Sequence, residues 1–159
     1  MLNHDGVNVN PKNNSGYTPV FVASHSGHLE VVRALLNHDG VDVNIKDNDG
    51  DTALIMANAK SHLEVVRTLL KHDGVDVNVQ NRNGLTPLMV ATLVGNLELV
   101  RALLKQDGVD VFRKNTKGDT ALNVARVERN ANVALVLEEH MKLMKQDSTA
   151  RIDATANMN

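Results

Sequence analysis

Apolar residues recur along the chain in two patterns that together predict a pair of short helices. From Leu29 to Leu36, apolar side chains follow a three-to-four-residue spacing, which is typical of an amphipathic helix. An apolar run comes before it and follows Thr18-Pro19, where threonine can cap a helix and proline can occupy its first position. Gly27 suits the left-handed turn that ends such a helix. The patterns therefore predict a helix, a turn and a second helix.

The residues after the second helix predict an extended connection. Asp39-Gly40 marks a turn. Val41 and Val43 then alternate with polar residues, as they do in a short extended segment. We expect this segment to lead to the next pair of helices.

The same patterns return with a fixed spacing of 34 residues. Near-copies of the first-helix segment begin at Thr18, Thr52, Thr86 and Thr120. A fixed period of this size indicates stacked repeats, in which each unit buries its apolar face against its neighbours. A stack of this kind presents a long surface to a partner.

The residues that carry this pattern resemble the ankyrin repeat. The family pattern runs G-x-T-P-L-H-x-A, then G-H-x-E-I-V-x-L-L, then G-A-D-V-N. The first full repeat matches it at Gly16, Thr18, Pro19, Ala23, Gly27, His28, Glu30, Val31, Val32, Leu35, Leu36, Asp42, Val43 and Asn44. The resemblance covers roughly residues 1–137. It implies an all-α ankyrin-repeat solenoid of stacked helix-turn-helix units joined by extended hairpin-like loops, and a role in protein–protein recognition without catalysis.

We expect one ankyrin repeat domain over residues 1–147. Its predicted parts are a partial repeat at 1–10 and repeats at about 11–44, 45–78, 79–112 and 113–147, with a capping helix that continues to about Lys145. Residues 148–159 are small and polar, and we expect them to be disordered. The chain opens on the tail of another repeat, which we interpret as a fragment of a longer array; the alternative is a short protein with a degenerate first repeat.

Two departures from the family pattern bear on stability. The position of the family histidine holds Phe21, Ile55, Met89 and Asn123, so we expect an apolar ladder between repeats. Ser61 replaces the turn glycine, at a cost of roughly 1 kcal/mol if it keeps a left-handed conformation. The second repeat also has alanine where the family has proline. We therefore expect it to be the softest internal repeat.

Composition narrows the class of function. Only 2% of the 159 residues are aromatic, so we expect a core of Leu, Val and Ala layers. The chain contains no cysteine, so no disulfide can form. Its net charge is −2. The charge gives no reason to expect nucleic acid or an anionic membrane as a partner. We expect no signal peptide, and no apolar run is long enough to span a bilayer. We expect a cytoplasmic location, with the nucleus as the alternative, and neither a cofactor nor a small-molecule substrate.

Two clusters resemble metal sites but lack the required geometry. His4, His38 and His72 recur at the repeat spacing. Equivalent atoms of stacked helices lie about 8–10 Å apart, which is too far for a shared metal with bonds near 2 Å. The acidic run from Asp47 to Asp51 has its glycine at the wrong position for a calcium loop and lacks the distant glutamate. No nucleophile–base arrangement, phosphate loop or H-E-x-x-H motif occurs, so we expect neither a metal site nor an enzyme.

Candidate partner-binding residues lie where the repeats differ, because the shared positions build the stack. By resemblance, these positions line the concave face and the loop tips. The predicted set is Tyr17, His25, Asp49, Asp51, Arg82, Leu85, Leu93, Val94, Lys117 and Asp119. Such a surface suits a partner protein with an apolar anchor and a basic flank. In an alternative interpretation, Leu93 and Val94 pack against neighbouring repeats.

Two other functions remain open from the sequence. The stretch could be a structural spacer within a longer array. Alternatively, Asn44 and Asn78 each end an Asp-Val-Asn with leucine eight residues before, and so resemble the asparagine that an intracellular, iron-dependent asparaginyl hydroxylase modifies in ankyrin repeats. The competing interpretation is that each asparagine hydrogen-bonds the backbone of the adjoining loop.

Overall fold

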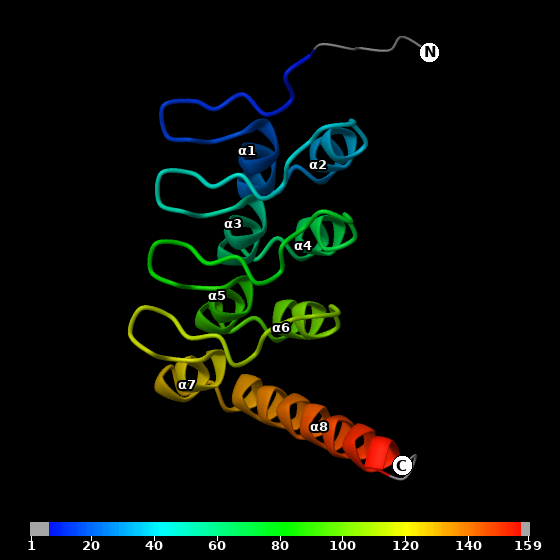
Figure 1. Ribbon diagram of the computed structural model, residues 1–159. Coiled ribbons are helices and arrows are strands. Elements are labelled where there is room, and N and C mark those ends of the chain that lie inside the picture. The colour runs from blue at the N-terminus through cyan, green and yellow to red at the C-terminus, as the bar shows by residue number, and fades with distance from the viewer. Residues whose placement is uncertain (1–6, 157–159) are drawn as a thin grey trace.

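Helices come in four pairs that stack along one axis, as the repeat spacing predicts (Figure 1). The computed structural model describes residues 7–156, with side chains for residues 7–147. The helices are α1 (Pro19–Ser26), α2 (Leu29–Leu36), α3 (Ala53–Ala59), α4 (Leu63–Leu69), α5 (Pro87–Val94), α6 (Leu97–Leu104), α7 (Ala121–Val127) and α8 (Ala131–Ala156).

Hairpin-like loops join the pairs without forming strands anywhere in residues 7–156 (Figure 1). Val43 and Asn44 form a turn at the place where alternation predicts an extended segment. Val43 is 2% exposed and belongs to the main core. The alternation of valine with polar residues therefore reflects the burial of Val43 in a turn.

Each first helix begins where the sequence predicts it. Thr18 accepts a hydrogen bond from the backbone N–H of Phe21 through its side chain, and Thr52, Thr86 and Thr120 do the same for the residue three positions later. Proline occupies the first turn of α1 and α5, where a missing N–H costs nothing. These contacts satisfy amide groups that an uncapped helix end would leave unpaired.

The turn between the helices of a pair is left-handed in all four repeats. Gly27 and Gly95 adopt it with φ of 73°. A Cβ atom at Gly27 would lie 2.7 Å from the ring of His62, so this position needs glycine for space as well as for conformation. Ser61 and Arg129 adopt the same turn, with φ of 59° and 55°, so Ser61 keeps the left-handed conformation on which its expected cost depends.

The core is one continuous strip along the stack. First helices contact first helices from α1 through α3 and α5 to α7, and second helices contact second helices from α2 through α4 and α6 to α8. Phe21, Ile55 and Met89 are 1–2% exposed, so the predicted apolar ladder exists in three repeats. Asn123 departs from it: this side chain is exposed and forms a capping box with Thr120.

The last helix is longer than predicted. α8 continues to Ala156, whereas the sequence predicted an end near Lys145 and a disordered tail from residue 148. The difference has a simple reason: no glycine or proline occurs between residues 131 and 156 to stop the helix. Residues 1–6 of the predicted partial repeat and residues 157–159 lie outside the described part of the chain. Within the described part, no helix combines the length and apolar character needed to cross a bilayer.

Candidate functional site

The loops form a row along one side of the stack, held together by backbone hydrogen bonds. Each successive loop tip donates an N–H to a carbonyl of the loop before it: Asn48 to Ser15, Arg82 to Asp49 and Thr116 to Asn83, each at 3.1 Å. The backbones approach so closely at Gly84 that a Cβ atom there would lie 2.7 Å from the amide nitrogen of Thr116. With φ of 71°, Gly84 is also left-handed.

Each loop is also braced from within. The side-chain oxygen of Asn81 accepts hydrogen bonds from the amides of Asn83 and Leu85, both at 3.0 Å. Asn13, Asp47 and Asn115 make the equivalent pair of bonds in their own loops. The backbone of the loop row is therefore held in place by hydrogen bonds within and between the loops.

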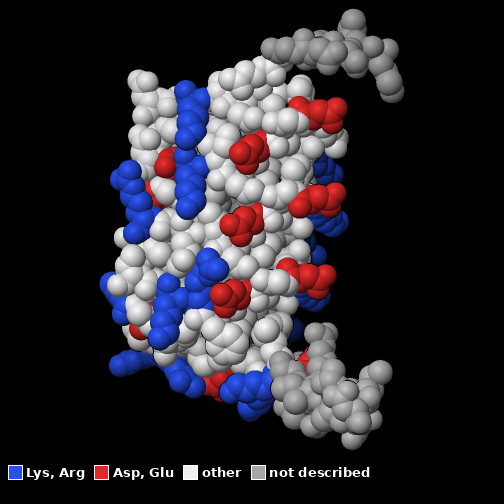
Figure 2. Space-filling view, in the orientation of Figure 1, with Lys and Arg blue, Asp and Glu red and all other residues white. Residues whose placement is uncertain are grey.

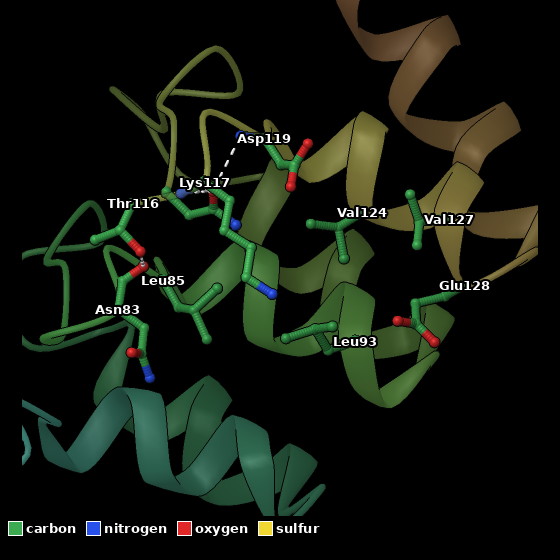
Figure 3. A pocket seen from close by; sticks show the side chains of 10 residues that line it. Asn83, Leu85, Leu93, Thr116, Lys117, Asp119, Val124, Val127 and Glu128 are labelled. Atoms are coloured by element: carbon green, nitrogen blue, oxygen red, sulfur yellow. Dashed lines mark hydrogen bonds between the residues drawn. The ribbon is translucent and has the colours of Figure 1, made fainter.

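A cavity of about 330 Å³ lies between the last two loops and the helices α5 and α7. Leu85, Leu93 and Val124 point into the same space, with Val127 at its edge (Figure 3). Leu93 is 42% and Val127 is 73% exposed, so both present apolar surface to solvent. Lys117, Asp119 and Glu128 complete the lining with charged groups. We call this the loop-4 cavity.

The loop-4 cavity brings together four of the predicted residues: Leu85, Leu93, Lys117 and Asp119. Val124, Val127 and Glu128 line it as well but lie outside the predicted set. Val127 and Glu128 occupy the same two variable positions of the repeat as Leu93 and Val94, and comparison of the repeats in the sequence already points to them. Val124 is 7% exposed and reads in the sequence as a core position.

The other predicted residues lie elsewhere along the stack. The ring of Tyr17 stacks on Phe21 with a centroid distance of 4.5 Å and an interplanar angle of 13°. His25, Asp49 and Arg82 are exposed on separate repeats. Val94 is exposed beside Leu93, at 43%. Neither of the last two residues is therefore buried against neighbouring repeats, contrary to the alternative interpretation.

Asp51 has a distinct electrostatic environment at the second loop. Burial raises the pKa of its carboxyl group above 3.8, its ordinary value; a hydrogen bond from Asn81 at 2.8 Å opposes this, and nearby Asp47 and Asp49 add to the rise. The carboxyl group is thus engaged with the next loop, which leaves Asp49 as the exposed acid of this loop tip.

The asparagines proposed for hydroxylation link neighbouring repeats. Asn44 donates from Nδ2 to the carbonyl of Gly74 at 2.6 Å and accepts through Oδ1 from the amide of Asp76 at 2.8 Å. Asn78 makes the same two bonds to Gly108 and Asp110, each at 2.8 Å. Both asparagines thus make backbone hydrogen bonds of the kind that the competing interpretation expects. Hydroxylation of Asn44 or Asn78 stays a prediction.

Charged side chains are arranged in rows that repeat along the stack, with both signs on the face shown in Figure 2. Ion pairs such as Arg33–Glu30 at 3.0 Å and Arg126–Glu138 at 2.8 Å are solvent-exposed. Among residues 7–147, no group of three or more His, Asp or Glu side chains is placed to hold a metal ion.

Comparison with known families gives one match. The family model described as "Ankyrin repeats (3 copies)" matches residues 1–81 and 73–147. No curated protein matches the chain significantly.

Proposed function

The chain belongs to the ankyrin repeat family, and from this premise we propose that it binds a partner protein through its concave face and loop tips, without catalysis. Ankyrin repeats are in general protein–protein interaction modules. The observation that carries the proposal for this chain is the loop-4 cavity, which joins exposed apolar side chains to a braced row of loops.

The cavity suits one apolar anchor side chain of the partner. Fully burying a leucine or valine side chain stabilises by about 1.5–3 kcal/mol. Leu93 is 42% and Val127 is 73% exposed, so covering both side chains with an anchor stabilises the complex by roughly 2 kcal/mol. Because the loop row is already hydrogen-bonded, little ordering cost opposes this gain.

Charges around the cavity suggest how the anchor is flanked. Lys117 favours an acidic residue on the partner, whereas Asp119 and Glu128 favour a basic one. Asp49 lies further along the loop row, exposed and without an ion pair among residues 7–147. It offers a basic flank a second, separate acidic group, because exposed Arg82 lies on the loop between Asp49 and the cavity.

The test is capture of a partner from a lysate of the source organism, read by mass spectrometry. The wild-type chain is compared with the double variant Leu93→Lys and Val127→Lys, which places two ammonium groups at the cavity. Leu135→Lys with Leu143→Lys is the matched control, since these aliphatic residues of α8 are 55% and 61% exposed and do not line the cavity.

We expect a partner that the wild type and the control retain and the cavity variant loses. Equal retention by all three chains would show that the cavity is not the binding site. Failure of the wild type to retain any partner would favour the alternative function, a structural spacer within a longer array.

A further inference from the structure

The second helices lie side by side along the stack, on the opposite side from the loop row (Figure 1). A hollow of about 390 Å³ lies between α4 and α6, the second helices of the two internal repeats. Leu70 and Ala102 contribute apolar lining. Four basic residues line the hollow as well: Arg67, Lys71, Arg101 and Lys105. Among the described residues that line it, Glu98 alone is acidic. We call it the α4–α6 hollow.

The arginines of the second helices have unequal ion pairs. Arg33 pairs with Glu30 of its own helix, at 3.0 Å. Arg67, one repeat further, lies 3.7 Å from Glu64 of its own helix and 3.8 Å from Glu98 of α6. The charge of Arg67 is therefore balanced from both sides.

Arg101 occupies the same position of the third repeat, but it forms no ion pair among residues 7–147. The glutamate of its own helix, Glu98, lies beside Arg67 of the preceding repeat instead. In the next repeat, the position equivalent to Glu98 holds Asn132, which has no charge. The Arg101 guanidinium therefore lacks both of the carboxylates that Arg67 has.

Two lysines add to the positive charge of the hollow. Lys71 and Lys105 share one position of the repeat, at the ends of α4 and α6, and both are exposed without an ion pair among residues 7–147. Cations at a helix C-terminus interact favourably with the helix dipole, which is one reason to find lysine there. However, α2 ends with Asn37 at this position, so the helix does not require a cation. The lysines lie where the repeats differ.

We propose that the α4–α6 hollow binds an acidic segment of a partner protein. Three cations without an ion pair line it, although the chain as a whole has a net charge of −2. A guanidinium presents parallel N–H donors that match the two oxygens of a carboxylate, so Arg101 suits an aspartate or glutamate of the partner. Leu70 and Ala102 can then cover the methylene groups of a glutamate side chain.

An extended segment that crosses both helices fits the spacing of the cations. Alternate side chains of an extended chain point the same way and lie about 7 Å apart, close to the separation of about 8–10 Å between packed helices. Exposed Asp73 and Asp107 follow the two lysines of the hollow by two residues each. A long polyanion such as nucleic acid would be repelled by these carboxylates, whereas a short acidic segment can avoid them. The charges therefore favour a protein segment.

The α4–α6 hollow shares no lining residue with the loop-4 cavity, so this proposal goes beyond the proposed function and can fail independently of it. The test is fluorescence anisotropy of a labelled peptide of alternating glutamate and serine, titrated with the 159-residue chain. The wild type should bind the peptide with an affinity that falls as salt is added, because exposed charges are screened. A peptide of alternating glutamine and serine should not bind.

The hollow variant combines Lys71→Gln, Arg101→Gln and Lys105→Gln, and it should bind the acidic peptide about tenfold more weakly, since three exposed ion pairs are lost. The matched control removes the same charge from exposed lysines that do not line the hollow: Lys60→Gln, Lys114→Gln and Lys142→Gln. The control should bind as the wild type does. Glutamine is a good helix former, so both variants should unfold cooperatively on heating.

Three results would overturn the proposal. The first is the absence of saturable binding of the acidic peptide by the wild type at low ionic strength. The second is equal weakening by the hollow variant and the control, which would indicate general attraction to the charge of the chain. The third is an oligothymidylate that binds the wild type more tightly than the peptide and is lost in the hollow variant, since the hollow would then be a nucleic-acid site.

Discussion

Replacing Ser61 with glycine is expected to stabilise the second repeat. Ser61 ends α3 in a left-handed turn with φ of 59°, a conformation that costs an L-residue about 1–2 kcal/mol. Glycine removes this strain but loses about 0.5–1 kcal/mol through its greater freedom in the unfolded chain. The expected net gain in the free energy of unfolding is therefore about 0.5–1 kcal/mol.

The reverse change at the equivalent turn should cost more than Ser61→Gly gains. Gly27→Ser introduces the same strain and also places Cβ 2.7 Å from the ring of His62. In the third repeat, the residue equivalent to His62 is Asn96, whose side chain accepts hydrogen bonds from the amides of Glu98 and Leu99 and so caps its own helix. Ser61 carries the strain of the turn, and Gly27→Ser adds the close contact with His62 to the same strain.

Thermal unfolding followed by circular dichroism measures both changes. For a chain of this size, 1 kcal/mol shifts Tm by about 2–4 °C. We expect Ser61→Gly to raise Tm by about 1–4 °C and Gly27→Ser to lower it by more than that. Hydrogen exchange should show slower exchange in α3 and α4 of Ser61→Gly, because repeats are stabilised locally. If Ser61→Gly left Tm unchanged or lowered it, the left-handed strain would not be a real cost at this position.

Three other predictions concern the repeats and their loops. In the wild type, amides of α3 and α4 should exchange faster than those of α5 and α6, because the second repeat lacks both the proline and the turn glycine; the opposite order would contradict this. Asn44→Ala should lower the free energy of unfolding by about 1–2 kcal/mol through loss of two hydrogen bonds between repeats, measured by urea unfolding. Phe112→Ala is its control: Phe112 occupies the same repeat position, is 48% exposed, and should change stability much less, so equal losses would count against the asparagine ladder. Asp51→Asn should stabilise the chain at neutral pH and have little effect below about pH 3.8, because the raised pKa means that ionisation of Asp51 disfavours the folded state as pH rises; a stability difference that is independent of pH would refute this cause.

Local chemistry explains why much of the fold could be predicted from the sequence. A threonine cap acts on an amide three residues away, and a turn glycine acts on its own φ angle, so these features need no knowledge of distant contacts. Ser61 illustrates this, since it keeps the left-handed turn of the glycine that it replaces in the repeat. The fixed period then determines stacking, because every unit must bury the same face against a like neighbour.

Contacts between repeats decided what the sequence could not. Val31 and Val65 occupy the same position of the repeated segment L-E-V-V-R, yet Val31 is 50% exposed and Val65 is 2% exposed. Val124 reads as a core residue but lines the loop-4 cavity, and Asp51 acquires its raised pKa only by burial beside the next loop. The type of a side chain is read directly from the sequence. Its exposure and its charge state depend on which atoms of other repeats lie beside it. The sequence by itself therefore determined the repeat and its register, and the tertiary structure decided which surfaces of the stack remain available for binding.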